Sequence, residues 1–404
     1  MVDGPVPTLS RRSLLGLLGA AAALPILPAC GSSVGTARGD ATIRVGLVIP
    51  QSGVYASLGT DLQRGWELWL EQHGGQLGPY PVETVVADEG ESPQTGVPAV
   101  QRMLQAENVD VVVGVVNSAT ALGVRDLMAE AGKLLVVTNA GAEDLTQRFR
   151  TPYIWRTSFT NAQLAAAMGR YLAESGFSDG VYVMAPDYAA GSEVITGFTR
   201  AFENGGGRVV GSVKTPFGTT SDYQPYFAAI PVSGAKATFC FYSGSEAITF
   251  VRQYAQFGLA SSIPLYSSGF LTEGNVLPQQ GGAALGVYGA LHYSDQLDNP
   301  ANRAFVEAYR ARHGEPPSCF SVQSYDAANV LDRALRAAGA RDGDALARAL
   351  GEIGTIDDSP RGPWTFDRQT PRQHIYLRRV ERQGSELVNT VVADLGLHSQ
   401  PVAA

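Results

Sequence analysis

The residues of this chain best suited to chemistry are Asn117 and Ser118, which stand between an apolar run and a helical pattern. At the start of a helix, these polar side chains can join the free backbone N–H groups of the first turn to bind an anion. Asparagine and serine are also preferred residues for capping a helix, a role that involves no ligand. The residues alone leave both interpretations open.

Five other short segments resemble Asn117–Thr120 in position and composition. Each follows a predicted strand and is made mostly of small or aromatic residues, with Asp187 as the one charged exception. Ligands of open α/β sheets bind beyond the carboxyl ends of the strands, where amides, hydroxyls and rings can surround them. The pattern therefore predicts a pocket for a small organic ligand. The five segments are Gln51–Tyr55, Asn139–Ala142, Asp187–Gly191, Tyr242–Ser245 and Ser267–Phe270.

The motifs of common enzyme classes are missing from the sequence, apart from a formal G-x-S-x-G match at Gly31–Gly35. That match lacks the strand before it and the helix after it that the motif needs, so it is interpreted as chance. The sequence has no H-E-x-x-H zinc motif, no G-x-G-x-x-G after the first predicted strand, and no P-loop lysine. The acidic cluster Asp88–Glu91 could bind a cation, but a solvated loop is the favoured interpretation. We expect no catalytic residue, no metal and no cofactor. The histidines lack metal-ligand spacing; they are His73, His292, His313, His374 and His398.

Apolar runs alternate with helical patterns from residue 42 onward, which indicates βαβ units and parallel sheets. A first series predicts strands at 43–49, 82–87, 109–116 and 133–138, with helices at 58–73, 95–107 and 119–131. A second series predicts strands at 181–185, 208–214, 237–242 and 264–267, with helices at 161–175, 193–204, 223–230 and 245–257. The remainder predicts helices at 301–313, 321–338 and 344–353, then strands at 375–380 and 387–393. So many crossovers fit two lobes better than one sheet.

The overall composition narrows the possible partners. The chain has 404 residues, a net charge of −8 and no basic cluster after residue 40, which disfavours nucleic acid as a partner. No run after residue 40 is long and apolar enough to cross a membrane. Cys240 and Cys319 could form a disulfide in an oxidising compartment, but the apolar run around Cys240 favours a buried thiol.

The first thirty residues have the pattern of an export signal. Arg11 and Arg12 precede an apolar run that ends in Leu27-Pro28-Ala29-Cys30. A basic start followed by such a run is typical of a signal peptide. The twin arginines and the position of Cys30 predict a Tat-type lipoprotein signal over 1–30, lipidated at Cys30, with a flexible tether over 31–41. A plain signal peptide cut near Ala23, or a short anchor, is the alternative.

Several stretches of the body follow this signal in a specific order. They are Val45–Gly59, Val113–Ser118, Ala142–Thr146, Ala185–Tyr188, Gly258–Leu259, Asp298–Pro300 and Ser324–Ala327. In this order they resemble the leucine/isoleucine/valine-binding family of ABC substrate-binding proteins, which has the type I periplasmic binding fold. The resemblance covers nearly all of residues 42 to 393.

The resemblance implies an α/β fold with two Rossmann-like lobes, whose parallel sheets are joined by a three-strand hinge. The crossovers would fall near Arg156, His292 and Trp364. The first lobe would then comprise 42–156 plus 293–363, and the second 157–292 plus 364–404.

The implied function is capture of a small ligand for an ABC importer. The protein would lie on the extracytoplasmic face of the membrane, anchored through its lipid alone, with a monomeric body and an ABC permease as partner. The ligand would be an amino acid, branched-chain or other, or an aromatic or aliphatic carboxylate or amide. A ligand sensor for a signalling receptor is the alternative, and a secreted enzyme is disfavoured.

The resemblance also implies a ligand site. Ser118 matches the serine that holds the ligand carboxylate in the family, together with neighbouring backbone positions. Leu58 stands where amino-acid binders often place an aromatic ring. Tyr188 lies in a loop that supplies a ring to the cleft, but Ala190 occupies the usual position of that ring. The remaining expected ligand contacts are Ala119, Ala140, Gly141, Tyr242, Ser243 and Phe270.

Phe270 is the largest departure from the family pattern. Branched-chain amino-acid binders place an acidic residue near this position to pair the ligand ammonium, and a buried ammonium without an anion is costly. The ligand is therefore expected to lack an amino group, unless Glu273 or Asp187 supplies the missing anion.

The lipidation signal is tested by Cys30→Ala. If Cys30 carries the lipid, this variant leaves the membrane fraction and appears in the soluble extracytoplasmic fraction, which cell fractionation and immunoblotting measure. Unchanged membrane association of Cys30→Ala would rule out lipidation at this residue.

Overall fold

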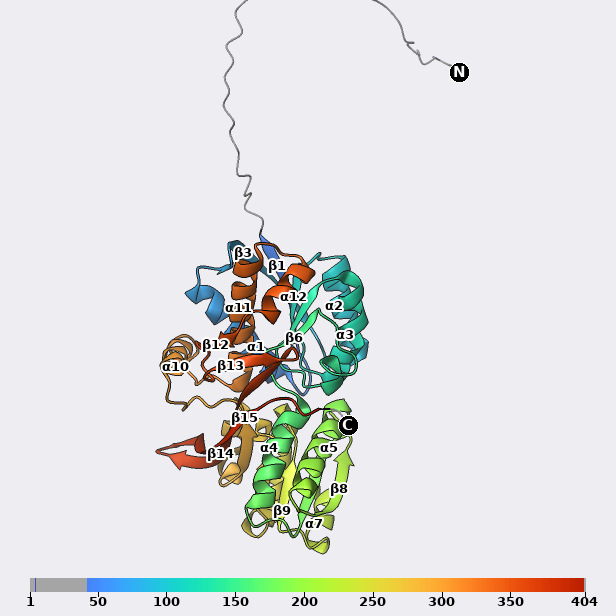
Figure 1. Cartoon of the computed structure of the whole chain (residues 1–404). Helices are drawn as coiled ribbons and strands as arrows, with labels where there is room; N and C mark the ends of the chain where they lie inside the picture. The colour runs from blue at the N-terminus through green and yellow to red at the C-terminus, as the bar shows by residue number, and fades with distance from the viewer. Residues whose placement is uncertain (1–3, 5–41, 403–404) are drawn as a thin grey trace, which may run out of the picture. The chain divides into compact units, whose positions relative to one another are not determined.

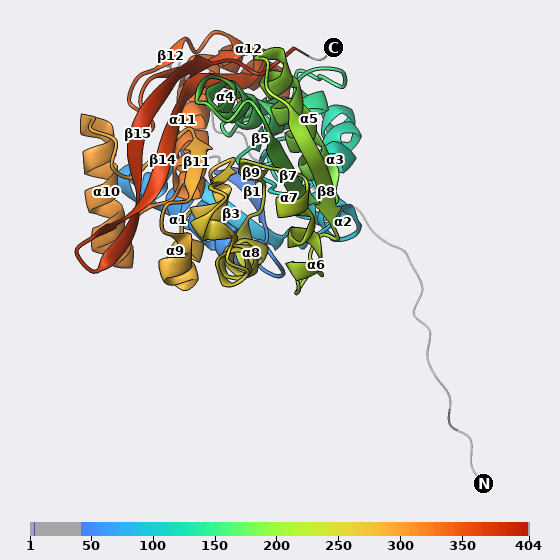
Figure 2. The same cartoon turned by 90° about the horizontal axis from the view of Figure 1, so that it is seen from below.

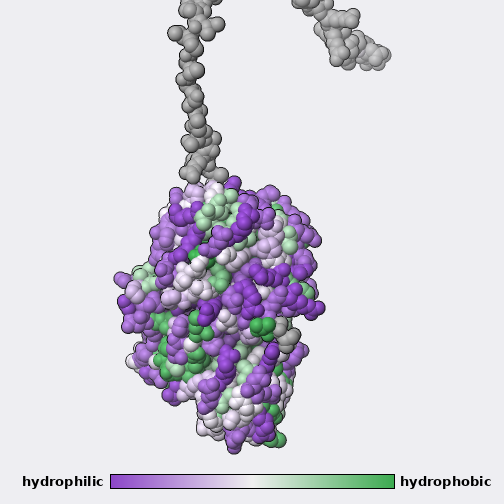
Figure 3. All heavy atoms as spheres, viewed as in Figure 1, coloured by the Kyte–Doolittle hydropathy of each residue, from purple (hydrophilic) through white to green (hydrophobic). Residues whose placement is uncertain are grey.

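The computed structural model describes Gly4 and residues 42–402. Cys30, the export signal and the tether predicted over 31–41 lie outside the described residues. In the described part, no helix is long and apolar enough to span a membrane. The face of the body seen in Figure 3 is largely hydrophilic, with scattered apolar residues.

The first lobe is built on a mainly parallel sheet. Its order is β2-β3-β1-β4-β5-β6, and only the short β2 runs antiparallel to its neighbour. The fully buried run of β4 explains why its residues are almost all valine, which suits a strand covered on both faces. The strands are β1 (Ile43–Ile49), β2 (Gln76–Leu77), β3 (Tyr80–Asp88), β4 (Val111–Gly114), β5 (Leu134–Val137) and β6 (Ile154–Arg156).

Helices cover both faces of this sheet (Figure 1). Val111 and Val113 belong to one apolar cluster with α1 and α11, whereas Val112 belongs to another with α2 and α3. This alternation follows the two-residue period of a strand. The helices are α1 (Ala56–Gln72), α2 (Pro93–Gln105), α3 (Ser118–Ala131), α10 (Pro300–His313), α11 (Cys319–Ala338) and α12 (Gly343–Gly351).

The second lobe has a parallel centre and an antiparallel edge. Its strands are β7 (Val181–Pro186), β8 (Val209–Thr215), β9 (Ala237–Cys240), β10 (Leu265–Ser267), β11 (Tyr288–Leu291), β12 (Thr355–Ile356), β13 (Trp364–Asp367), β14 (Thr370–Gln383) and β15 (Glu386–His398). Their order is β12-β13-β14-β11-β10-β9-β7-β8, and β15 pairs with β14. The helices are α4 (Asn161–Glu174), α5 (Ala189–Asn204), α6 (Gln224–Phe227), α7 (Ala229–Val232), α8 (Gly244–Gln256) and α9 (Val276–Gln280). Figure 2 shows α4 and α5 on one side of β7 and β9, with α8 on the other.

The chain passes between the two sheets three times. It enters the second sheet after β6, leaves it after β11 for helices that pack on α1, and returns with β12 and β13. The predicted fold class is confirmed. The exact lobe boundaries at 156, 292 and 364 stay a prediction.

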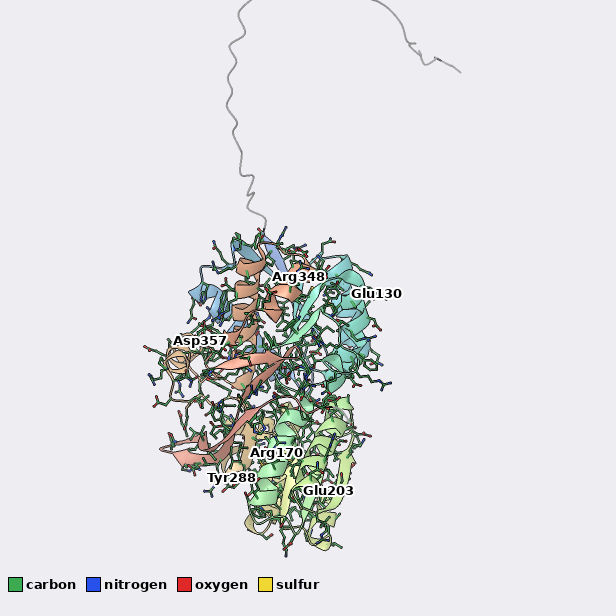
Figure 4. The ribbon with its side chains drawn as sticks, in the orientation of Figure 1. Glu130, Arg170, Glu203, Tyr288, Arg348 and Asp357 are labelled. Atoms are coloured by element: carbon green, nitrogen blue, oxygen red, sulfur yellow. The ribbon has the colours of Figure 1, made fainter. Side chains whose placement is uncertain are left out.

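Most predicted elements lie within a few residues of the observed ones. The strand predicted over 109–116 stops at Gly114, because Gly114 and Val115 have φ angles of 131° and 53° and turn the backbone out of the sheet. The strands β2, β6, β11, β12 and β13 were not predicted. Charged residues on the outer elements are solvent-exposed (Figure 4), as seen at Glu130, Arg170, Glu203, Arg348 and Asp357.

Candidate ligand-binding site

A small cavity lies where the carboxyl ends of the two sheets face each other. Loops after β1, β4, β5, β7, β9 and β10 contribute to its wall, as the rule for open α/β sheets predicts. Its lining residues are Tyr55, Leu58, Val116, Ser118, Asn139, Gly141, Phe159, Asn161, Tyr188, Ala190, Phe241, Ser243, Phe270 and Phe320.

The lining of this cavity is aromatic and uncharged. Six of its residues carry aromatic rings, and no charged residue of the described chain belongs to it. Phe270 stands at the centre of the rings: its centroid lies 4.8 Å from that of Phe159, 6.0 Å from Phe320 and 6.2 Å from Phe241. Such a surface suits a flat apolar group, because aromatic pairs are stabilised beyond simple burial.

Glu89 holds the turn that brings Ser118 to the cavity. Its two carboxylate oxygens accept hydrogen bonds from the N–H groups of Val116 and Asn117, at 2.7 and 2.8 Å. Burial raises the pKa of Glu89 to about 8, although these two bonds oppose the rise. The positive φ of Val115 just before this turn is unusual for a β-branched residue. The buried carboxylate therefore stabilises a backbone conformation that valine alone disfavours.

Asn117, not Ser118, caps α3. The Oδ1 atom of Asn117 accepts from the N–H groups of Ala119 and Thr120, at 2.9 and 3.2 Å. These two amides are consequently unavailable to a ligand. The Ser118 hydroxyl faces the cavity, where it accepts a long hydrogen bond of 3.3 Å from Asn161 Nδ2.

Two tyrosines close the cavity from opposite lobes. The hydroxyl groups of Tyr55 and Tyr188 are 2.8 Å apart. Nearby, Ser245 N–H donates to Val54 O at 3.2 Å, so the loops after β1 and β9 also meet through their backbones. Gly244 is required here, since a Cβ atom would lie 2.1 Å from Val54 O. The lobes are thus closed over the cavity.

Two further polar groups of the wall differ in how they are satisfied. Ser243 precedes α8 but makes no capping bond, and its buried Oγ has no hydrogen-bond partner among the described residues. Asn139 instead donates to Gln323 at 2.9 Å, and Gln323 Nε2 lies 3.2 Å from His292 Nε2. Burial lowers the pKa of His292 well below its usual value, so this histidine is neutral. Ser243 is therefore the more available partner for a ligand.

The structure places most of the sequence-predicted residues at the cavity. Ser118, Gly141, Tyr188, Ser243, Phe270 and Leu58 line it. Their contact with a ligand stays a prediction.

Three predicted positions lie elsewhere. The N–H group of Ala119 donates to Asn117 Oδ1, and the N–H group of Ala140 donates to Val115 O. Tyr242 does not line the cavity. It follows β9 and packs in a different apolar cluster, where its hydroxyl lies 3.0 Å from Thr215 Oγ1, whereas Phe241 lines the cavity.

Neither candidate anion for an amino group lies at the cavity. Glu273 is buried against Arg378, with Oε2 2.7 Å from Nη1, and its other oxygen accepts from Cys319 N–H. Asp187 pairs with Lys214 at 2.8 Å on the surface. Neither residue belongs to the lining.

The acidic cluster and the cysteines also have structural roles. Asp88 accepts from Gln51 and Gly90 N–H, and Glu91 accepts from Val54 N–H. The prediction of a solvated loop at Asp88–Glu91 was wrong for Glu89, which is fully buried, whereas Glu91 is exposed. Within the described residues no acidic, histidine or cysteine cluster could hold a metal ion. Cys240 and Cys319 are free, buried thiols, as favoured for Cys240.

Several lining residues were missed from the sequence. Tyr55 lies in the Gln51–Tyr55 segment, which is predicted to border a pocket, but the sequence does not mark Tyr55 itself as a ligand contact. Phe159 and Asn161 follow β6, a three-residue strand too short to give a pattern. Phe320 comes from the start of α11, about two hundred residues from the Ser118 loop, and nothing local marks it.

Comparison with known proteins assigns this architecture. A family model described as "Periplasmic binding protein" matches residues 42–385. This chain belongs to the periplasmic binding protein family. Among curated relatives, Leu/Ile/Val-binding protein homolog 6 from Brucella melitensis is 32% identical, with 84% of this chain and 88% of the relative covered. The resemblance to the leucine/isoleucine/valine-binding family is thereby confirmed.

Solved structures of similar periplasmic binding proteins include two with aromatic ligands. A solute-binding protein of an ABC transporter from R. palustris, in complex with benzoate, has a TM-score of 0.82 and 34% identity, covering 89% of this chain and 98% of its own. Another, from Rhodopseudomonas palustris, is in complex with 3,4-dihydroxybenzoic acid. It has a TM-score of 0.83 and 31% identity, covering 89% of this chain and 99% of its own.

The buried carboxyl groups near the cavity predict how stability depends on pH. Burial raises the pKa of Glu89 to about 8 and those of Glu193 and Glu246 to about 7. In the unfolded chain these groups lose their protons at much lower pH. Between roughly pH 4.5 and 8 the folded protein therefore holds more of these protons than the unfolded chain, so this contribution to the unfolding free energy falls as pH rises.

Glu89→Gln tests this account. Glutamine removes one titrating group and turns an N–H donor toward a backbone N–H, so we expect a loss of about 1–3 kcal/mol and a shallower pH slope. Urea denaturation across this pH window measures both, with Glu130→Gln, an exposed change on α3, as the control. Wild-type stability and slope in Glu89→Gln would contradict the role given to this carboxylate.

Proposed function

We propose that this periplasmic binding protein serves an ABC importer and that its ligand is an aromatic carboxylate of the benzoate class. The observation that carries the proposal is the lining of the cavity, which combines six aromatic rings with a few hydroxyl and amide groups and no charged side chain of the described residues. Closure of the lobes would bury the ligand ring among Phe159, Phe270 and Phe320.

The charge balance of the cavity favours this class over amino acids. An α-amino acid brings an ammonium as well as a carboxylate, and a buried ammonium needs an anion nearby. Glu273 and Asp187 are already paired with Arg378 and Lys214, outside the cavity. A ring can attract a cation by only about 0.5–2 kcal/mol. A ligand without an amino group avoids this cost.

The polar groups of the cavity support a carboxylate at one end. The Ser118 hydroxyl and the Gly141 backbone line the cavity from the first lobe, and Asn161, at the start of α4, donates to the Ser118 oxygen. Ser243 stands on the loop after β9, in the opposite lobe, where its unpartnered hydroxyl could bind a polar substituent of the ring. Two similar proteins in complex with benzoate and 3,4-dihydroxybenzoic acid add support to this ligand class.

The protein is further proposed to act at the extracytoplasmic face of the membrane, with an ABC permease as its partner. Family membership supports delivery of a ligand to an ABC permease from the extracytoplasmic side. The pattern from Arg11 to Cys30 supports a lipid anchor as the means of attachment. The closed lobes would present a surface to the permease that depends on ligand occupancy.

Ligand class is tested by calorimetry on protein that has been unfolded and refolded to remove carried ligand. We expect benzoate or 4-hydroxybenzoate to bind at least about tenfold more tightly than leucine or valine, because the ammonium of an amino acid would be buried without an anion. Tenfold in affinity corresponds to about 1.4 kcal/mol. Micromolar or tighter binding of leucine, with no response to aromatic acids, would overturn the proposed ligand class.

Ser118→Ala separates ligand binding from helix capping. A hydrogen bond to a charged group contributes about 1.5–3 kcal/mol, so we expect benzoate affinity to fall by roughly tenfold or more, with little change in stability. Asn117→Ala is the comparison. It removes the cap of α3 and is expected to lower the unfolding free energy by about 1–2 kcal/mol. Unchanged benzoate affinity in Ser118→Ala would remove Ser118 from the site.

A further inference from the structure

Arg156 is a buried cation without a paired carboxylate. Its side chain is fully buried, and no acidic group of the described residues lies within ion-pair distance of it. The guanidinium instead donates to three backbone carbonyls and a hydroxyl. These are Ala140 O at 3.1 Å, Phe159 O at 2.9 Å, Ala142 O at 2.8 Å and Thr146 Oγ1 at 3.2 Å. Burying a charge in this way is costly unless an anion balances it.

The positive charge lies directly behind the cavity wall. Ala140 O belongs to the same peptide group as Gly141 N–H, and Gly141 lines the cavity. Gly141 N–H donates to no other group of the described residues. A hydrogen bond at the carbonyl of a peptide strengthens the N–H as a donor, because linked hydrogen bonds polarise one another. Phe159, another carbonyl partner of Arg156, also lines the cavity.

We infer that Arg156 supplies the counter-charge for the ligand carboxylate, through the peptide between Ala140 and Gly141, and so sets the preference for anionic over neutral ligands. The inference rests on the proposed function, since it needs a carboxylate ligand. Arg156 does not touch the ligand in this arrangement. It is a specificity-determining residue that acts through the backbone.

Two carboxyl groups near Arg156 would oppose the ligand charge. Glu193 Oε2 accepts from Asn161 Nδ2 at 2.7 Å, and the same amide donates to Ser118. Glu143 accepts from Ala162 N–H at 3.1 Å. Burial raises the pKa of Glu193 to about 7, while Arg156 and the Asn161 bond oppose the rise. Neither Glu193 nor Glu143 lines the cavity. An anionic ligand and ionised Glu193 therefore compete for electrostatic stabilisation by the Arg156 guanidinium.

The test compares benzoate with benzamide, which has a similar shape and no charge. Each affinity is measured by calorimetry, and the ratio of the two reports the preference for the anion. In Arg156→Met we expect this ratio to fall by roughly tenfold or more, the scale of a charge interaction at an effective dielectric constant of about 20. Arg156→Lys retains the charge and is expected to keep most of the preference.

Glu193→Gln provides a second test that leaves Arg156 and its hydrogen bonds in place. It removes the competing charge while keeping an oxygen that can accept from Asn161, so we expect the benzoate-to-benzamide ratio to rise by about threefold or more. Glu203→Gln, an exposed change near the end of the same helix, is the control and is expected to leave the ratio unchanged.

The outcomes separate this inference from the proposed function. If wild-type protein binds benzoate but Arg156→Met weakens benzoate and benzamide equally, Arg156 has only a structural role and the inference is overturned. If Arg156→Met does not fold, an unchanged ratio in Glu193→Gln overturns it. If wild-type protein binds leucine rather than benzoate, the proposed ligand class fails and the inference fails with it.

Discussion

The hydrogen bonds of the Arg156 guanidinium connect the parts of the molecule that make the cavity. Ala140 and Ala142 belong to the loop after β5 in the first lobe, whereas Phe159 lies in the segment that enters the second lobe. One buried side chain thus joins the loop after β5, which lines the cavity, to the segment that leads into the second lobe. The same charge can balance an anion in a cavity whose described lining residues are all neutral. In the proposed account, ligand selection depends on this buried cation.

Closure of the lobes gives the weak interactions of the site their strength. The Tyr55–Tyr188 hydroxyl contact and the Ser245–Val54 backbone bond join the lobes beside the ligand cavity. Excluding water lowers the effective dielectric constant, so hydroxyl and amide donors hold a carboxylate more firmly there than at a surface. In the same closed state, the rings that surround Phe270 stabilise a flat ligand through aromatic contacts. Binding and closure are therefore expected to be one coupled equilibrium.

The fold could be predicted from the sequence more fully than the site. The strand over 43–49 was predicted at its exact bounds, because a long buried run with turns on both sides has a clear pattern. The site depends on side-chain direction and burial, which that pattern does not contain. Phe241 and Tyr242 are the two residues after β9, yet they pack in different apolar clusters. Glu89 was read as part of a solvated loop, although its carboxylate is fully buried beneath backbone N–H groups.

The central claim is that the cavity holds an aromatic carboxylate with its anionic end at the first lobe. The most direct measurement is a crystal structure with 4-bromobenzoate, in which anomalous scattering locates the bromine. The account predicts the carboxylate beside Ser118 and Gly141, the ring among Phe159, Phe270 and Phe320, and the bromine toward Ser243. A bromine beside Ser118, or a ligand outside this cavity, would contradict it.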